Sequence, residues 1–327
     1  MKQVRVGFIG AGGIATRHFG VLREFHDVKI VAFADPMLER ALSLAQRGNA
    51  NAYEDYREML DKEQIDALYI CVPPFAHGEP EMAAIEHGLP FFVEKPVATR
   101  LETAERVAEA VQAKGIITGV GYHWRYMTTV EEAKSLVAEH PPHLVLGYWL
   151  DGTPPPAWWV RDAESGGQMV EQTTHVFDLA RYLVGEVDSV YAMGAHYPRP
   201  EFPESDIFET TTASLRFASG ALGNVSSSCL LHWQHRVGLH LFGAGLVIEI
   251  GEFDAMIDVG QGRPVIGQEG DPVVREDRDF IDAVLGLNQR IRVPYTEALK
   301  TLQLTLAATR SAKEGREINL KDEAAYV

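Results

Sequence analysis

An apolar run that leads into a glycine-rich turn constrains the fold more than any other part of this chain. Residues 4–9 are typical of a strand, Gly10-Ala11-Gly12-Gly13 follows them, and a helix-like stretch begins near Ile14. A helix that starts directly after such a turn directs its first backbone N–H groups outward. These groups and the positive end of the helix dipole bind phosphate. The pattern predicts a diphosphate site at this turn.

A second apolar run, residues 28–34, ends on Asp35. In dinucleotide-binding folds an acid about 20 residues beyond the glycine turn accepts hydrogen bonds from the adenosine ribose. A 2'-phosphate at that place would face a like charge. We therefore expect NAD, with NADP less favoured. The residues expected to hold it here are Gly10, Gly12, Gly13, Ile14 and Asp35.

Length and charge limit the classes of protein to which the chain can belong. Its 327 residues favour two domains. The net charge of −16 argues against nucleic-acid and membrane partners, because such a surface repels phosphate backbones and anionic lipid. No apolar run reaches the roughly 18 residues of a membrane span, and the early first strand leaves no room for a signal peptide, so we expect a cytoplasmic protein. Cys71 and Cys229 are expected to be buried free thiols, and no metal site is expected.

Strand-like and helix-like runs alternate up to residue 122. This alternation is typical of an α/β domain with a doubly wound parallel sheet, which binds ligands beyond the carboxyl ends of its strands. The strands are expected at 4–9, 28–34, 67–72, 90–94 and 116–121, with helices between them such as 37–47 and 100–114.

Beyond residue 122 strand-like runs follow one another across short turns, which predicts an α+β domain with a large, mostly antiparallel open sheet flanked by helices. We expect domains at 1–122 and 123–327, with the final helix packing back toward the first domain. The sheet needs its other face covered, so we expect a homodimer or homotetramer formed through it. Strands are expected at 144–150, 187–196, 208–217, 221–228, 237–242 and 246–250, and helices at 126–139, 166–184, 276–287 and 295–313.

Two polar groups are candidates for chemistry. Lys95 directly follows an apolar strand, at the end of a parallel sheet where ligands bind, and Pro96 would allow a cis bond before it. In the predicted helix 166–184, Glu171, His175 and Asp178 share the face opposite the apolar residues. A carboxylate one turn before a histidine orients the imidazole and raises its pKa. The alternative interpretation is the solvated side of a surface helix.

These motifs together resemble the Gfo/Idh/MocA family of oxidoreductases, named for glucose-fructose oxidoreductase, inositol dehydrogenase and rhizopine catabolism. The resemblance covers essentially the whole chain. It implies a Rossmann domain, Lys95 as a substrate-hydroxyl or proton-relay residue, and His175 as the general acid/base. Glu171 stands where the family usually has Asp, and serves as the carboxylate partner. The residues implied to lie beside the cofactor are Pro73, Pro74, His77, Glu94 and Lys95.

Further residues are candidates for substrate binding. His123 stands where the family often has Asn, and Arg125 either binds substrate or bridges the domains. Aromatic planes beside an arginine suit a sugar ring or a carboxylate. An arginine paired with an acid of its own domain would instead be structural. The candidates are His123, Arg125, Trp158, Trp159, Arg161 and Asp178.

The function we expect is NAD(H)-dependent oxidation of a secondary alcohol on a sugar, cyclitol or sugar acid, or the reverse reduction. His175 would take the hydroxyl proton and Lys95 would stabilise charge on oxygen. One alternative is a glycosidase in which NAD oxidises the sugar transiently before elimination. Another is a nicotinamide-sensing regulator without catalysis.

Overall fold

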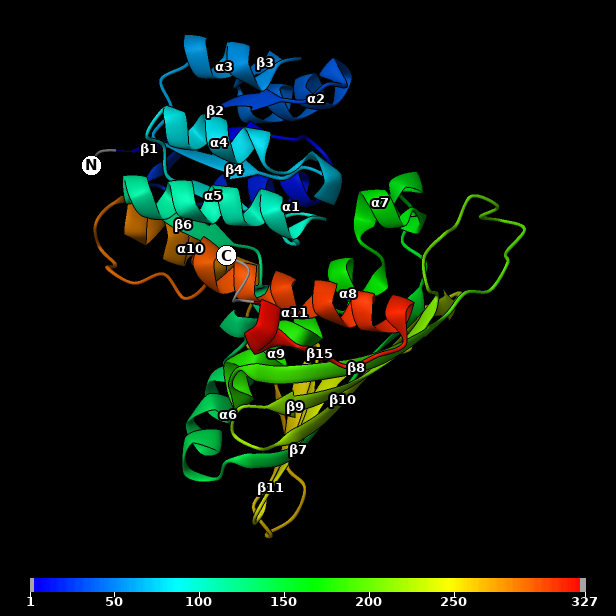
Figure 1. Ribbon diagram of the computed structural model, residues 1–327. Helices are drawn as coiled ribbons and strands as arrows, with labels where there is room; N and C mark the ends of the chain where they lie inside the picture. The colour runs from blue at the N-terminus through cyan, green and yellow to red at the C-terminus, as the bar shows by residue number, and fades with distance from the viewer. Residues whose placement is uncertain (1–2, 324–327) are drawn as a thin grey trace. The chain divides into compact units, whose positions relative to one another are not determined.

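The chain forms two compact units, and the first of them is discontinuous. The computed structural model describes residues 3–323 (Figure 1). The first unit comprises Met1–His123 and Asp271–Leu299, and the second comprises Trp124–Gly270 and Lys300–Val327. The first crossing lies one residue beyond the boundary predicted after 122. The prediction of an uninterrupted second domain is corrected by the return of residues 271–299 to the first unit.

The first unit is built on a six-stranded sheet with the order β3-β2-β1-β4-β5-β6, and all of its pairs are parallel. The order reverses between β1 and β4, where doubly wound folds bind ligands. The predicted parallel sheet is confirmed, while β3 was not predicted. Its strands are β1 Val4–Ile9, β2 Val28–Ala34, β3 Asn51–Tyr53, β4 Ala67–Ile70, β5 Phe91–Val93 and β6 Thr118–Val120.

The helices of the first unit cover the sheet, and aromatic rings fill the space beneath them. α1 packs on α10, and α4 packs on α5. Phe8, Tyr69 and Phe92 stack in sequence across three strands, and Phe280 of α10 meets the last two edge to face. The returning segment is therefore part of this core. The helices are α1 Gly13–Leu22, α2 Leu38–Gly48, α3 Tyr56–Lys62, α4 Glu79–Glu86, α5 Leu101–Lys114 and α10 Pro272–Val284, with a short 3-10 turn η1 Pro74–Ala76.

The second unit is built on a nine-stranded sheet with the order β14-β13-β12-β11-β7-β10-β9-β8-β15. Every pair is antiparallel except β7 with β10, so the prediction of a mostly antiparallel sheet is confirmed. Its strands are β7 Pro142–Gly152, β8 Val187–Ala195, β9 Thr210–Phe217, β10 Leu222–Leu231, β11 Arg236–Gly243, β12 Leu246–Gly251, β13 Asp254–Asp258, β14 Val265–Gly267 and β15 Ile318–Asn319.

Helices cover one face of this sheet and leave the other open. α6 and α9 pack on the covered face (Figure 1). Along β7, Val145 is buried, whereas its neighbours Leu144 and Leu146 are 43% and 38% exposed. Such alternation is expected where only one face of a sheet is packed. The helical segments are α6 Thr128–Glu139, α7 Asp162–Ser165, α8 Gln168–Glu171, α9 Thr174–Val184 and α12 Leu320–Glu323, with the 3-10 turn η3 Ala157–Val160. The helix α11 Tyr295–Glu314 and the 3-10 turn η2 His123–Tyr126 begin in the first unit and continue into the second.

The single helix predicted over 166–184 is wrong, because the segment is broken into α8 and α9. Gly166 and Gly167 have φ angles of 78° and 80°, which end α7 in left-handed backbone. α8 then stops at Glu171, and α9 begins only at Thr174. Glu171 and His175 therefore lie on separate helices.

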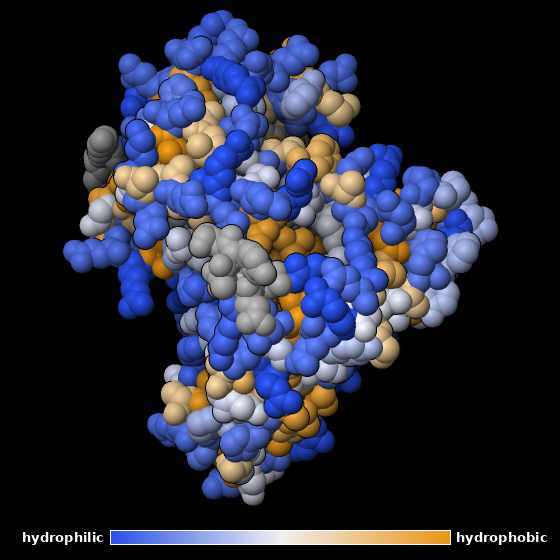
Figure 2. Space-filling model, in the orientation of Figure 1, coloured by the Kyte–Doolittle hydropathy of each residue, from blue (hydrophilic) through white to orange (hydrophobic). Residues whose placement is uncertain are grey.

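The surface agrees with the acidic composition. In the view of Figure 2 hydrophilic residues dominate, with hydrophobic ones scattered among them.

Both cysteines are buried and free, as predicted. Burial raises the pKa of both thiols, to about 11 for Cys229. Among residues 3–323, no helix is long and apolar enough to cross a membrane.

The close packing of β7 against α9 yields a stability prediction. A Cβ at Gly147 would lie 2.5 Å from Cγ1 of Val176, so Gly147→Ala overpacks the second unit. We expect the free energy of unfolding in urea to fall by about 1–3 kcal/mol. Adding Val176→Ala should give a total loss smaller than the sum of the single losses. Gly267→Ala, where a Cβ meets nothing within 4 Å, is the matched control. Equal losses of unfolding free energy in Gly147→Ala and Gly267→Ala would contradict this account.

Candidate functional site

The glycine turn has the geometry that the diphosphate prediction requires. Gly10 has φ +92°, and a Cβ there would lie 2.3 Å from the carbonyl oxygen of Cys71. Gly12 is the N-cap of α1 and makes no side-chain cap, and added Cβ atoms at Gly12 and Gly13 would meet nothing within 4 Å. The start of α1 therefore has room for a diphosphate beside its N–H groups.

Asp35 is fixed beside this turn by two backbone hydrogen bonds. Its Oδ2 accepts the Ala11 N–H at 2.8 Å, and its Oδ1 accepts the Met37 N–H at 2.8 Å. A carboxylate has about four acceptor sites, so further capacity remains for ribose hydroxyls. The turn and Asp35 together fit a dinucleotide with a free 2'-hydroxyl.

The segment after β4 supplies another wall. Pro74 begins the 3-10 turn η1, and His77 ends it. His77 is buried, and its Nδ1 lies 2.6 Å from Oε1 of Glu81, while its Nε2 makes no hydrogen bond within the described residues. Pro73, Pro74 and His77 stay predictions as cofactor contacts.

Lys95 follows β5, and the Lys95–Pro96 bond is cis, as the sequence suggested. The Lys95 side chain is half-buried. The carboxylate of Glu94 is directed into the first unit: Oε1 lies 3.0 Å from His18 Nε2, and Oε2 accepts the Lys95 N–H at 3.1 Å. The Glu94 side chain is thus hydrogen-bonded within the first unit, and its role as a cofactor contact stays a prediction. Burial lowers the pKa of the nearby His123 to about 4, so its ring is neutral near pH 7.

In the second unit, His175 is one of three aromatic rings at similar distances from one another, because the centroids of Trp124 and Trp149 are themselves 6.1 Å apart. Its ring is nearly parallel to Trp124 at 6.2 Å and 19°, and to Trp149 at 5.9 Å and 21°. His175 is buried, and these ring contacts restrict the orientation of the imidazole plane. Sequence reasoning missed both tryptophans as partners, because nothing in their spacing links η2, β7 and α9.

Glu171 contacts a tryptophan that was expected at a pocket rim. Its Oε2 accepts the Nε1–H of Trp159 at 2.6 Å. Trp159 is 1% exposed and forms a small core with Val160, Ile207 and Cys229, against which Trp158 packs. Core packing therefore replaces the rim assignment of Trp159, which holds the Glu171 carboxylate, whereas the assignment of the half-buried Trp158 stays a prediction.

Arg125 and Asp178 satisfy each other rather than lining a surface. The guanidinium donates two hydrogen bonds of 2.7 Å to the two carboxylate oxygens, and both side chains are buried. Thr301 of α11 donates a third bond of 2.8 Å to Asp178. A bidentate pair of this kind ties η2, α9 and α11 together inside the second unit. This structural pair replaces the substrate contacts expected of both residues.

Arg161 pairs with Glu164 of its own unit at 2.6 Å. This is the arrangement under which an arginine counts as structural, so Arg161 is withdrawn as a substrate ligand. The sequence argument placed it correctly near the segment of Glu171 but could not show its partner.

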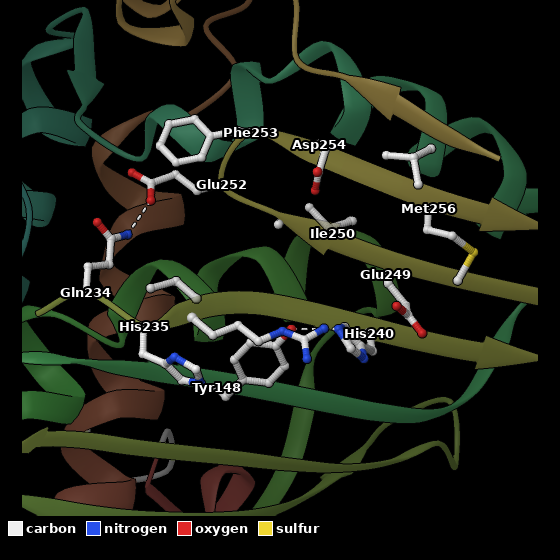
Figure 3. A pocket seen from close by; sticks show the side chains of 14 residues that line it. Tyr148, Gln234, His235, His240, Glu249, Ile250, Glu252, Phe253, Asp254 and Met256 are labelled. Atoms are coloured by element: carbon white, nitrogen blue, oxygen red, sulfur yellow. Dashed lines mark hydrogen bonds between the residues drawn. The ribbon is translucent and has the colours of Figure 1, made fainter. Parts of the chain in front are cut away.

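A cavity of about 450 Å³ lies on the open face of the nine-stranded sheet (Figure 3). There the hydroxyl of Tyr148 lies 2.7 Å from Nε2 of His240, and Arg236 covers the Tyr148 ring. None of the residues predicted for chemistry lines this cavity, and no sequence signal pointed to it.

Comparison with known proteins identifies relatives of this chain. A family described as an oxidoreductase family with an NAD-binding Rossmann fold matches residues 4–122, and a GFO/IDH/MocA C-terminal domain matches residues 141–248. An uncharacterized oxidoreductase, YrbE of Bacillus subtilis, is 28% identical over 98% of this chain and 97% of its own length. An NAD(+)-dependent scyllo-inositol 2-dehydrogenase of the same species is 30% identical over 76% of this chain and 74% of its own.

Solved structures show the same fold. A levoglucosan dehydrogenase in complex with NADH superimposes with a TM-score of 0.89 at 22% identity, covering 98% of this chain and 99% of that one. A probable dehydrogenase from Thermotoga maritima gives 0.84 at 27% identity, with coverage of 98% and 99%.

The hydrogen bonds of Asp35 lead to a prediction about cofactor choice. We expect Asp35→Ser to weaken NAD and to improve NADP relative to it, because the substitution removes the charge that repels a 2'-phosphate. Dissociation constants from nucleotide fluorescence titrations measure this ratio. Asp55→Ser, at the N-cap of α3 in the same unit, is the control and should change neither constant. A wild-type preference for NADP would show that Asp35 does not select the cofactor.

Proposed function

The chain belongs to the Gfo/Idh/MocA family of NAD-binding oxidoreductases, and we propose that it oxidises a secondary alcohol of a cyclitol or sugar, or reduces the corresponding ketone. The observation that carries this proposal is the buried His175 ring, which packs against both Trp124 and Trp149, in a family of NAD-binding oxidoreductases. A ring fixed in one plane presents its nitrogens in one direction. This is what a general base at an alcohol requires.

The proposed reaction separates the two hydrogens of the alcohol. Bound NAD supplies the hydride acceptor for the carbinol C–H bond. His175 takes the hydroxyl proton as the C=O bond forms, and returns it in the reverse direction. The Lys95 ammonium stabilises negative charge that develops on the oxygen. Glu171, whose carboxylate accepts the Trp159 indole N–H, is the carboxylate partner that we propose for His175.

The names of relatives support the substrate class. They include a myo-inositol 2-dehydrogenase of Thermotoga maritima and the scyllo-inositol enzyme. We therefore propose a ring polyol for this chain. The substrate can be identified by testing inositols, sugars and sugar acids with NAD and with NADP. The absorbance of reduced nicotinamide measures each reaction. Turnover without net reduction of NAD would instead favour the transient oxidation of a glycosidase.

The acid/base role of His175 predicts a kinetic effect. We expect His175→Ala to lower kcat by about 10² to 10⁴, because the alcohol proton loses its acceptor. The dissociation constant of NAD should stay unchanged. His143→Ala, an exposed histidine on β7, is the control and should keep full kcat. Near-normal kcat in His175→Ala would refute the assignment.

We also propose that the open face of the nine-stranded sheet joins copies of this chain in a homodimer or homotetramer. Apolar side chains on this face are exposed, which a partner surface would cover. They include Leu144, Leu146, Tyr191, Met193 and Leu222. Leu144 and Leu222 are paired in register on β7 and β10, so one substitution pair alters the centre of the face.

The double variant Leu144→Glu with Leu222→Glu tests this assembly. We expect it to lower the molar mass measured by light scattering, because buried carboxylates would oppose association. Leu42→Glu on α2, where the side chain is 52% exposed, is the control and should leave the mass unchanged. A monomeric wild-type protein, or an unchanged mass in the double variant, would exclude the interface.

A further inference from the structure

A histidine that the proposed reaction does not use lies at the centre of the first unit. His18 is on α1, and its side chain is completely buried. Its Nδ1 lies 2.8 Å from Oδ1 of Asp277 on α10, and its Nε2 lies 3.0 Å from Oε1 of Glu94 after β5. One ring therefore joins three elements that are distant in the sequence.

The two hydrogen bonds define the protonation of this ring. Ionised carboxylates only accept, so both ring nitrogens must donate and the ring is an imidazolium. Burial alone lowers the pKa of His18, but the two carboxylates outweigh it and hold this pKa well above its ordinary value. Burial raises the pKa of Glu94, and the His18 hydrogen bond reverses this, so the pKa of Glu94 lies below its ordinary value. The titratable groups facing the ring are Tyr69 from β4, Glu94, and Glu276 and Asp277 from α10.

Glu94 passes this contact on to its neighbour. Its backbone N–H donates to the Ile70 carbonyl at 3.0 Å, which fixes the start of the segment to β4. Its other carboxylate oxygen accepts the Lys95 N–H. A Cβ at Gly121 would lie 2.4 Å from Glu94 Oε1, so the carboxylate is also confined from the side of β6. The orientation of the Glu94 side chain therefore determines the position of the Lys95 backbone, and with it the position from which the Lys95 side chain extends.

We propose that His18 is a positioning residue for Lys95, which it holds in place by clamping the Glu94 carboxylate against Asp277. The inference rests on the proposed action of Lys95 on the substrate oxygen. α1 also begins at the glycine turn, so the same helix that faces the diphosphate carries the clamp. The contacts of His18 with Glu94 and Asp277 thereby couple α1 to the segment that carries Lys95 within the first unit.

Removal of the ring from the full-length, NAD-loaded protein tests this role without the need for turnover. In His18→Gln both N–H donors sit on one nitrogen, so the amide cannot reproduce donors at the positions of Nδ1 and Nε2, and Glu94 loses its fixed position. We expect the Lys95 amine to react severalfold faster with acetic anhydride, because a segment that has lost its anchor opens more often to the reagent. Mass spectrometry measures this rate, with exposed Lys29 of β2 as the internal reference. NAD affinity should stay unchanged, and His26→Gln, an exposed histidine of the same unit, is the matched control.

A double-mutant cycle separates positioning from simple support. If His18 acts through Glu94, then His18→Gln, Glu94→Gln and the double variant should show similar Lys95 reactivity and similar kcat with myo-inositol, or with the ring polyol that the substrate panel identifies. Independent roles would instead make the two effects multiply. A folded His18→Gln protein with unchanged Lys95 reactivity and unchanged kcat, whatever its melting temperature, would overturn the inference.

Two further measurements keep the result decisive. If His18→Gln does not fold, Asp277→Asn keeps the ring and removes one of its carboxylates, and the same Lys95 reactivity is measured. In the unsubstituted protein, ¹⁵N-histidine spectra should show the His18 ring protonated on both nitrogens at a pH where an ordinary histidine is neutral, and a neutral ring there would refute this role of His18. Normal kcat in Lys95→Met would refute the proposed action of Lys95, whereas the Lys95 reactivity would still report whether His18 positions it.

Discussion

The fit of Gly10 against the Cys71 carbonyl is the constraint on which the first unit depends. Any side chain at Gly10 would collide with that oxygen, so β1 and β4 can end side by side only with glycine there. Their shared edge then receives the glycine turn, Asp35 at the end of β2 and Lys95 after β5. A chain with a net charge of −16 can in this way serve an anionic dinucleotide, because oriented backbone N–H groups replace an attractive overall field.

Strong local patterns explain which elements the sequence could predict. The apolar runs at 4–9 and 28–34 match β1 and β2 residue for residue, since parallel strands buried on both faces give continuous apolar sequence. β3 reads Asn-Ala-Tyr and has no fully buried residue, so it carries no apolar run that would indicate a strand. The break in the helix was missed because the apolar residues on either side of Gln172 and Thr173 keep a helical spacing. The turn between α8 and α9 depends on tertiary packing, which periodicity does not record.

The chemical site was predictable in part for the same reason. Gly10, Asp35 and Lys95 stand at strand ends, so connectivity alone brings them to one edge. The partners of His175 and Asp178 come from other elements: Trp124 and Trp149 flank the first, and Arg125 and Thr301 bind the second. The residue types predicted a polar helix face. Only the folded structure shows which of these side chains is positioned for chemistry and which is paired in a buried ion pair. His18 shows the converse, since a lone histidine on an apolar helix face gives no hint of two carboxylate neighbours.

The return of residues 271–299 means that the nucleotide-binding unit is not a separable piece of the polypeptide. β6 relies on it, because Val120 donates its N–H to Val293, and Thr118 accepts the N–H of Tyr295. A fragment that stops at residue 123 would lack these partners and Asp277 as well. In covalent terms, residues 124–270 are an insertion into the first unit, not an appendage to it. Because the second unit comprises Trp124–Gly270 and Lys300–Val327, recombination that exchanges it must cut the gene at three places, whereas a single fusion point would leave the nucleotide-binding unit incomplete.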